Sequence, residues 1–533
     1  MISTAKVNLL LHAHLPYVRH LEYPSFLEED WLFEALHETY IPLLRILEDL
    51  DRSGHDFRLS ICFSPTFTTM CLDEPLQERF VAYLNSRIEL GEKEVARAKK
   101  EAPEVLKIAT FYLEQAKSNL AFYENYGRNI LTGYRKLSEK GRVELVATAA
   151  TNAYFPLYRN YETAIRAQIE LGVKSHIRVF GEAPRGFWLP ECGYYPGVEN
   201  ILSEYGIKWI QLPSQSVITA KNRLEKADHA PTLVGDSQIS SFIRDWSLTN
   251  LVWSDAYGYP CDPDYREFYR DIGYDLPMSY IQPYIHDDIR VFTGYKYWAI
   301  TSQTAVEKKV YDFTRAEAKV QLHAENFLYH IRRRGIALTS ETGDEPVYTI
   351  CFDADLFGHR WFEGLSFIRQ ILLSDPGKTG ISFTTPSECL GCFVPTERGY
   401  FNECSWGKGG FSDVWLDGSN AWIYRHTHKA IERMQELSFR FPAQSSLKAR
   451  FLNQAAREVL LAMASDWPYI MYDKTSVNYA EKRLRNHLGS FNVVYSNMCK
   501  NAVNTEWLIK AEKRNAIFPE IDYNIFIPKG KKK

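Results

Sequence analysis

Two acidic side chains in the sequence are placed where they could carry out catalysis. Glu191 follows a short apolar segment and lies between Trp188 and Tyr194, and Asp353 comes directly after the apolar segment 347–352. A carboxylate among aromatic rings must be paired or functional, because an unpaired buried charge is costly. A Glu and an Asp at two strand ends are the minimum for glycoside hydrolysis, one as nucleophile or base and the other as proton donor. The alternative for Glu191 is a structural role as a loop cap.

His12 and His14 alternate along an apolar N-terminal segment, so a strand would direct both imidazoles to one face. Three interpretations are open from the residues alone. The pair could bind a metal ion, as in metal-dependent hydrolases. It could instead stay neutral and hydrogen-bond the hydroxyls of a substrate, or both rings could be satisfied by buried structural partners.

Two further clusters carry groups suited to a polar ligand. Asp355 and His359 follow the second carboxylate closely, so one side chain can face a ligand while the other braces a neighbour. Trp406 lies in a glycine-rich segment, with Trp415 soon after it. These glycines do not form a phosphate-binding loop, because no strand and no Gly-Lys-Ser/Thr sequence frames them. We therefore expect a platform on which sugar rings stack.

The elements that must position these residues alternate between short apolar segments and helical patterns. We expect strands at 7–11, 57–63, 143–148, 186–189, 208–212, 291–293 and 347–352. Near-continuous apolar strands separated by helices indicate βαβ units and a parallel sheet that is covered on both faces. So many strands favour an α/β barrel, whose active face is formed by the carboxyl ends of the strands.

Two regions depart from this alternation. Residues 76–139 are charged and helical in pattern, and Pro103 should split this helical insertion into two antiparallel helices. After residue 402 no strand pattern recurs, and helices are expected at 421–437, 446–465 and 480–494. The predicted domains are therefore a catalytic β/α barrel at 1–400 and an all-helical domain at 401–533.

The composition excludes several classes of protein. The 533 residues include 63 Lys and Arg against 66 Asp and Glu, a net charge of −3, so no basic face for nucleic acid is expected. No run of about 18 apolar residues is present that would span a membrane. Nine scattered cysteines suggest reduced thiols and a cytoplasmic location, and we expect the N-terminal segment to be a buried strand, not a signal peptide.

Together, the motifs resemble those of glycoside hydrolase family 57, and within it those of α-1,4-glucan branching enzymes and long α-amylase-like members. The matching motifs are His12, His14 and Pro16; Glu144 and Leu145 leading to 151–156; Trp188 to Tyr194; Asp353 to His359; and short matches at 258–260, 265–268, 293–294, 405–407 and 465–467. The resemblance covers nearly the whole chain. It implies an α/β fold with an incomplete, seven-stranded β/α barrel, a helical insertion and an all-α C-terminal domain that completes the glucan cleft.

The resemblance also implies roles for individual residues. Glu191 would be the nucleophile and Asp353 the acid/base. The implied substrate-binding residues are His12, His14, Trp188, Arg266, Gly294, Asp355, His359, Trp406, Trp415, Asp466 and Trp467. Family members work without a catalytic metal, so the two histidines would contact the sugar next to the cleaved bond. No cofactor is expected, and the expected partner is an α-glucan.

The implied activity is that of a retaining transglycosidase, by default a 1,4-alpha-glucan branching enzyme that works by double displacement through a glycosyl-enzyme intermediate. Within the family the alternatives are α-amylase or 4-α-glucanotransferase activity, or a weakened homologue that binds glucan. A metal-dependent polysaccharide deacetylase is the alternative from another class, because such enzymes also combine paired histidines with Asp at barrel strand ends.

Several residues depart from the branching-enzyme pattern. Asn152 replaces a usual His, Asp355 a usual Glu, Arg360 a usual Trp and Thr475 a usual Gln. Branching members also carry a loop with a Tyr that closes over the intermediate and favours transfer over hydrolysis. The comparable segment here, 217–253, contains no tyrosine. Branching, hydrolysis and disproportionation are therefore all open outcomes.

Overall fold

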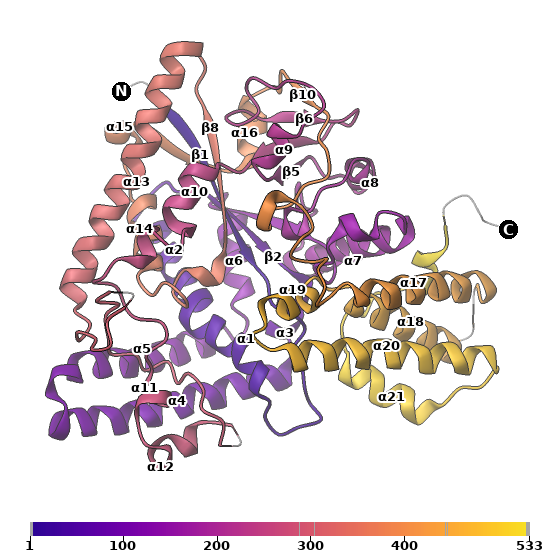
Figure 1. The fold of residues 1–533 in the computed structure, drawn as a ribbon, viewed down its shortest axis with the longest axis horizontal. Coiled ribbons are helices and arrows are strands. Elements are labelled where there is room, and N and C mark those ends of the chain that lie inside the picture. Colours follow the sequence, from indigo (N-terminus) through magenta and orange to yellow (C-terminus); the bar gives the residue numbers. More distant parts are fainter. Residues whose placement is uncertain (1–3, 287, 303, 443, 445, 529–533) are drawn as a thin grey trace.

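The computed structural model of the protein describes residues 4–286, 288–302, 304–442, 444 and 446–528 (Figure 1). Its centre is a curled sheet with the strand order β10-β6-β7-β5-β4-β3-β2-β1-β8, and β9 also pairs with β1. The strands are β1 Ala5–Ala13, β2 Leu59–Phe63, β3 Val143–Thr148, β4 Gly186–Trp188, β5 Trp209–Leu212, β6 Thr232–Val234, β7 Ser240–Ile243, β8 Val347–Asp353, β9 Ile381–Thr384 and β10 Arg398–Gly399. Seven of them, from β8 through β1 to β5 and on to β7, are joined by parallel pairing. The predicted seven-stranded α/β barrel is confirmed.

The two ends of the seven-stranded sheet meet at a narrow seam. Just beyond β7, Arg244 forms a single parallel bridge with Thr349 of β8, and the Asp245 amide donates to the Thr349 carbonyl at 2.7 Å. One bridge stands in place of the longer ladders between the other barrel strands, so the barrel is closed incompletely. β6 extends the sheet beside β7 as an antiparallel strand, and β10 pairs with β6.

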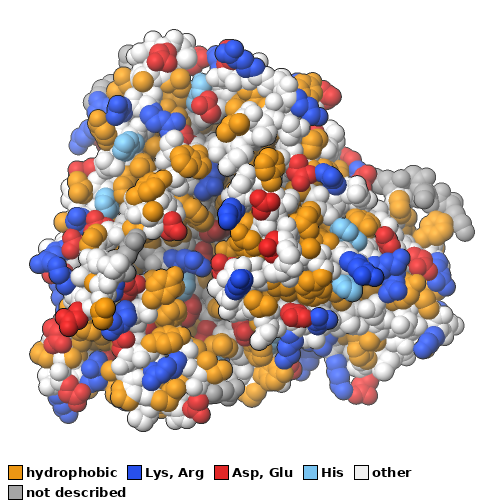
Figure 2. Space-filling model, viewed as in Figure 1, with side chains coloured by type: hydrophobic (Ala, Val, Ile, Leu, Met, Phe, Trp, Pro, Cys, Tyr) orange, Lys and Arg blue, Asp and Glu red, His pale blue; other side chains and the backbone are white. Residues whose placement is uncertain are grey.

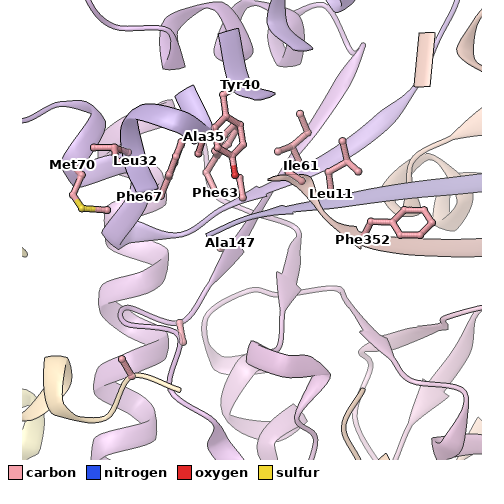
Figure 3. Packing of buried hydrophobic residues seen from close by; sticks show 14 of the residues in the cluster. Leu11, Leu32, Ala35, Tyr40, Ile61, Phe63, Phe67, Met70, Ala147 and Phe352 are labelled. Carbon is pink, nitrogen blue, oxygen red and sulfur yellow. The ribbon is translucent and has the colours of Figure 1, made fainter. Parts of the chain in front are cut away.

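Side chains at alternate strand positions enter two different hydrophobic cores. Leu11, Ile61 and Phe352 face outward and pack against the surrounding helices (Figure 3). Leu10 points the other way, into a smaller cluster inside the barrel that also contains Trp188. Burial on both faces explains why the strand segments are apolar along nearly their whole length.

The strand predictions hold for six segments and fail for one. Residues 291–293 form no strand, because the Thr293 amide and hydroxyl both donate to the Asp271 carboxylate, at 2.9 and 2.7 Å, instead of to a neighbouring strand. Four strands are absent from the predicted set: β6, β7, β9 and β10, which are two to four residues long. In β7, Ser240 and Ser241 interrupt the apolar pattern although both are buried.

Helices connect the strands and cover the outside of the barrel. The longer ones are α2 Ile41–Arg52, α6 Leu131–Glu139, α7 Glu162–Phe180, α10 Trp246–Trp253, α13 Phe313–Thr342 and α14 Gly364–Leu372, and α3 Pro65–Cys71 has seven residues. The shorter ones are α1 Asp30–Glu34, α8 Val198–Glu204, α9 Gln215–Ile218, α11 Ile272–Asp275, α12 Met278–Ile281, α15 Pro376–Thr379 and α16 Pro386–Cys392. In α2, for example, buried Leu43, Leu47 and Leu50 recur at the helical spacing and face the barrel core.

The predicted helical insertion is present. Its two long helices, α4 Glu74–Glu101 and α5 Leu106–Asn125, pack on one another at the lower left of Figure 1. Asp73 caps the start of α4, and Pro103 begins the short turn that separates α4 from α5. Glu94 of α4 is completely buried and accepts hydrogen bonds from Arg97 at 2.7 Å and from the Tyr297 hydroxyl at 2.8 Å. This polar contact ties the insertion to the segment that follows α12.

The C-terminal part of the chain is helical, as predicted. Its helices are α17 Trp422–Arg440, α18 Ser446–Ala462, α19 Asp466–Asp473, α20 Val477–Cys499 and α21 Thr505–Arg514, at the right of Figure 1. α18 packs on α20, and a buried hydrogen bond of 2.7 Å joins Glu458 to His487 between them. The division of the chain into domains at residues 400 and 401 stays a prediction.

The surface charges, the helix hydropathy and the thiols of the structure can be described directly. Lys, Arg, Asp and Glu side chains are intermixed over the face drawn in Figure 2, without a large area of a single sign. Within the described ranges, no helix has the length and apolar character needed to cross a membrane. All nine cysteines are free thiols.

Candidate active site

The mouth of the barrel lies one layer of side chains above the interior hydrophobic cluster. Leu10 of β1 and Cys351 of β8 are register partners that both lie in the interior cluster, and the next inward-facing pair is His12 and Asp353. The strand ends therefore place these two side chains next to each other, with His12 Nδ1 3.2 Å from Asp353 Oδ1. Asp353 ends its strand at the face where α/β barrels carry their active sites.

Glu191 lies in a tight turn, Pro190–Cys192, directly after β4. Its backbone has φ 59° and ψ 24°, a left-handed conformation that is costly for a residue with a side chain and is common at functional sites. Three donors hold its carboxylate: Trp406 Nε1 at 2.9 Å, Ser465 Oγ at 2.8 Å and Asn152 Nδ2 at 3.2 Å. The carboxylate is thus fixed in one orientation, and two of its donors come from the chain after residue 401.

His12 is buried between aromatic rings. Its imidazole stacks on Trp188, with ring centroids 4.7 Å apart, and on His14 at 5.5 Å. Burial, together with the positive charge of His14, lowers the pKa of His12 to about 3, so the ring is neutral near pH 7. With its proton on Nδ1, neutral His12 donates to Asp353. Its Nε2 has no partner among the described residues.

His14 has a different electrostatic environment. Its Nδ1 lies 2.9 Å from the Ser64 hydroxyl, and its Nε2 lies 3.0 Å from the Asp466 carboxylate. Burial alone would lower the pKa of His14, but the Asp466 carboxylate, together with the charges of Glu191 and Asp353, leaves the pKa above its usual value. His14 therefore favours the imidazolium form while His12 stays neutral. In the part of the chain that the structure describes, no three His, Cys, Asp or Glu side chains are grouped to hold a metal ion.

These contacts join the two carboxylates into one site. Glu191 accepts from Ser465, and the residue after Ser465 binds His14. His14 stacks on His12, which contacts Asp353. Burial raises the pKa of Glu191, its hydrogen bonds lower it in part, and the charge of Asp353 raises it further. Burial also raises the pKa of Asp353, to about 6, against the lowering effect of the surrounding positive charges.

A second group of predicted residues lies around a separate cavity of about 460 Å³. Arg266 and Gly294 line this cavity, and Arg266 Nη2 donates to the His359 carbonyl at 2.9 Å. The His359 imidazole pairs with Glu38 at 2.7 Å, a lining residue that has no motif in the sequence to mark it. The described lining includes neither carboxylate of the barrel mouth. The predicted site residues therefore fall into two adjoining groups.

Asp355 and Trp406 are two further predicted site residues, and both side chains are partly exposed. Asp355 follows the acidic strand end in a short turn, is half-buried, and has a pKa raised by burial and by the charge of Asp353. Trp406 is half-buried, and its ring meets the ring of Trp188 edge-on at 5.3 Å. Both side chains keep exposed surface that a substrate can reach.

Three of the predicted sugar-binding rings are buried and expose almost no surface to a ligand. Trp188 is 0 % exposed, and Trp415 and Trp467 are each 1 % exposed. Trp188 stacks on the His12 imidazole, and Trp415 stacks on Tyr154 with ring centroids 4.4 Å apart. The Trp467 indole donates to the Leu461 carbonyl at 2.8 Å. These rings hold the walls of the site in place.

The structure also adds residues that the sequence reasoning gave no role. Ser465 lies in a matched motif, but its contact with a residue 274 positions earlier could not be read from the sequence. Tyr469, one turn further on α19, is 46 % exposed, and its amide donates to the Ser465 carbonyl at 3.1 Å. Arg244 reaches the barrel mouth from β7, a strand that was not predicted.

Comparison with known proteins agrees with this architecture. The family model for glycosyl hydrolase family 57 matches residues 8–400, and the model for the C-terminal region of 1,4-alpha-glucan branching enzymes matches residues 426–526. A 1,4-alpha-glucan branching enzyme of Thermococcus kodakarensis is 30 % identical over 516 residues, which cover 91 % of this chain and 72 % of that protein.

Solved structures give the same picture. The crystal structure of the novel alpha-amylase of Thermotoga maritima has a TM-score of 0.92 and 39 % identity, covering 98 % of this chain and 99 % of that one. The branching enzyme of Pyrococcus horikoshii has a TM-score of 0.88 and 29 % identity, covering 99 % and 98 %. From the family model and the relative in T. kodakarensis, the chain belongs to glycosyl hydrolase family 57 and is an enzyme of that family.

Proposed function

We propose that this enzyme cleaves α-1,4-glucans with retention of configuration and transfers the cleaved glucan to a glucan 6-hydroxyl, as a 1,4-alpha-glucan branching enzyme. The observation that carries the proposal is the chain of contacts that links Glu191 to Asp353 across one barrel mouth. It is supported by the relative in T. kodakarensis and by the match of residues 426–526 to the branching-enzyme C-terminal model.

The mechanism assigns one step to each carboxylate. Glu191, held by its three donors, attacks the anomeric carbon while protonated Asp353 gives its proton to the leaving oxygen. The resulting glycosyl-enzyme is then attacked by an acceptor hydroxyl, which Asp353 deprotonates. His12, His14 and Asp466 would bind hydroxyls of the sugar next to the cleaved bond. The second cavity, with Arg266 and Gly294, would bind the glucan further along.

The cleft is built from both parts of the chain, which bears on the proposed domains. Ser465 and Asp466 reach Glu191 and His14 from the turn that begins α19. We infer that the barrel, 1–400, carries both reacting carboxylates and that the helical part, 401–533, completes the glucan cleft. The helical part thereby also orients the nucleophile.

Hydrolysis, as in an α-amylase, is the second candidate. It is favoured by the 39 % identity with the alpha-amylase of T. maritima. The Tyr-free segment 217–253 is also not one long loop here, because β6, β7 and α10 take up its second half. From this segment Trp253, 42 % exposed, approaches Trp406 with ring centroids 6.3 Å apart. The glycosyl-enzyme then reacts with a glucan rather than with water to the extent that the Trp253 ring keeps water away from it.

The decisive experiment incubates the enzyme with amylose and counts products by proton NMR. A branching enzyme raises the number of α-1,6 linkages with little increase in reducing ends. An amylase raises reducing ends alone, and a 4-α-glucanotransferase changes chain lengths with neither increase. Formation of reducing ends without any α-1,6 linkage would overturn the branching assignment, and no change in amylose at all would overturn the proposed activity.

The raised pKa values predict a bell-shaped dependence of activity on pH. Turnover needs Glu191 ionised and Asp353 protonated. As the pH rises through about 6, Asp353 loses its proton and the rate of the first step falls. As the pH falls, Glu191, whose pKa is raised by burial, takes up a proton and cannot attack. We expect kcat/KM on amylose to be highest in mildly acid solution; a plateau extending well above pH 8 would contradict this assignment.

A further inference from the structure

Arg244 directly follows β7, at the same end of the barrel at which His12 and Asp353 lie on β1 and β8. Its amide donates to the Leu212 carbonyl of β5 at 2.8 Å, and its backbone bridges to Thr349 of β8, so it spans the seam of the barrel. Phe242, two residues earlier, lies in the interior cluster. Because strand side chains alternate, Arg244 is directed inward one layer above Phe242, into the mouth.

The guanidinium of Arg244 lies beside two aromatic rings, and among the described residues it forms no ion pair with a carboxylate. It lies 5.5 Å from the centroid of Trp406 and 5.8 Å from that of Trp253. Its Nε is buried and has no hydrogen-bond partner among the described residues. Trp406 in turn donates its indole N–H to Glu191 at 2.9 Å. A cation in this position is costly unless it interacts with other groups, and the positive charge of Arg244 acts on the Asp353 carboxyl, whose pKa it lowers.

The charges around Asp353 show what the guanidinium adds. The titratable and charged groups that face Asp353 are His12 at the end of β1, His14 just after it, Tyr40 before α2, Glu191 after β4, Arg244 after β7, Asp355 and Arg360 after β8, and Tyr469 on α19. Of the two arginines, Arg360 is exposed, so solvent screens its charge, whereas Arg244 is half-buried. Of the two arginines, Arg244 therefore carries the charge that water and salt screen less, and it acts on Asp353 together with the buried His14.

We propose that Arg244 is a positioning residue of the active site, which braces Trp406 against Glu191 and keeps a fixed positive charge facing Asp353. Its part in turnover rests on the proposed function, whereas its effects on Trp406 and on the charge of Asp353 do not. Lysine would keep the charge but lose the planar guanidinium that lies against the two indoles. Methionine would keep much of the length and lose both properties.

The test compares Arg244→Met and Arg244→Lys with Arg334→Gln as the matched control. Arg334 pairs with Asp245, the next residue on the same seam, at 2.7 Å, but lies on the ring of Tyr348, outside the barrel mouth. Two readouts are followed against pH: kcat/KM on amylose, and the indole N–H signal of Trp406 in enzyme labelled with ¹⁵N-tryptophan. The Trp406 signal is identified with a Trp406→Phe variant.

We expect Arg244→Met to lower kcat about tenfold or more, and to move the alkaline limb of the pH profile to higher pH, because Asp353 loses a stabilising charge. Arg244→Lys should keep the limb in place but shift the Trp406 signal. Arg334→Gln should change neither.

An unchanged limb and an unchanged Trp406 titration in Arg244→Met would overturn the proposal. If that variant does not fold, a wild-type Trp406 signal in Arg244→Lys would overturn the bracing role. An enzyme inactive on amylose would refute the proposed function, while the Trp406 titration would still test Arg244.

Discussion

Glu191→Gln is expected to lower the turnover of amylose by about 10⁴-fold or more, because an amide cannot attack the anomeric carbon. The change should leave the fold intact. Glutamine has the same shape, and its oxygen can still accept from Trp406. The Ser465 hydroxyl can rotate to accept from the new NH₂ group, and the Asn152 amide can flip so that its unpartnered oxygen, not its NH₂, faces that group. Glucan binding should stay within about threefold of the wild type, because the walls of the cleft are unchanged.

The measurement pairs kcat on amylose with calorimetric titration of a maltooligosaccharide. Glu199→Gln is the matched control, since Glu199 follows the same turn, is 5 % exposed, and is held by the Tyr194 hydroxyl at 3.1 Å and the Gly197 amide at 2.8 Å. That variant should lose stability without losing turnover at moderate temperature. If Glu191→Gln kept even a tenth of the wild-type rate, another group would have to be the nucleophile.

The parts of the site that could be predicted are those that depend on short-range sequence. His12 lies near the end of β1 and His14 is the residue just after it, so their shared face follows from the alternation of side chains along an extended chain. Asp353 ends the clearest apolar segment of the chain, and its place at the barrel mouth follows from the α/β architecture. In the fold, Pro103 marked the division of the insertion into α4 and α5 for an equally local reason.

What could not be predicted depends on contacts between distant parts of the chain. The segment 291–293 reads as a strand, but the Asp271 carboxylate, about twenty positions earlier, binds its donors. Trp415 and Trp406 look alike in the sequence, yet Trp415 is buried on Tyr154 while Trp406 reaches Glu191. Exposure of an aromatic ring is set by its neighbours in space, which composition and spacing do not specify.

The short strand β7 shows how one missed element hides a functional residue. Ser240 and Ser241 are buried, and Ser241 donates its hydroxyl to the Thr232 carbonyl at 3.0 Å, so two polar residues fit an interior position. Without the strand, there is no reason to place Arg244 in the barrel mouth. A periodicity search that tolerates serine within short strands would have found it.

Asp353→Asn should separate the two chemical steps. We expect the turnover of amylose to fall by about 10²- to 10⁴-fold, because the leaving oxygen receives no proton. An α-maltosyl fluoride needs no such proton, since fluoride is a good leaving group, so the first step should remain fast. The glycosyl-enzyme should then accumulate, because no base at 353 activates the acceptor. His12 can still donate to the asparagine oxygen, so the geometry of the cleft is kept.

The measurement is release of fluoride in a stopped-flow instrument, and the decisive result is a burst equal to the enzyme concentration, with mass spectrometry locating the maltosyl group on Glu191. Asp355→Asn is the comparison, because its carboxyl lies in the same short segment but has no assigned proton transfer. It should show a smaller loss on amylose and no burst. Glu191→Gln should release no fluoride at all. A burst in Glu191→Gln and none in Asp353→Asn would require that the roles of the two carboxylates be exchanged, because only the nucleophile is needed when the leaving group departs without a proton.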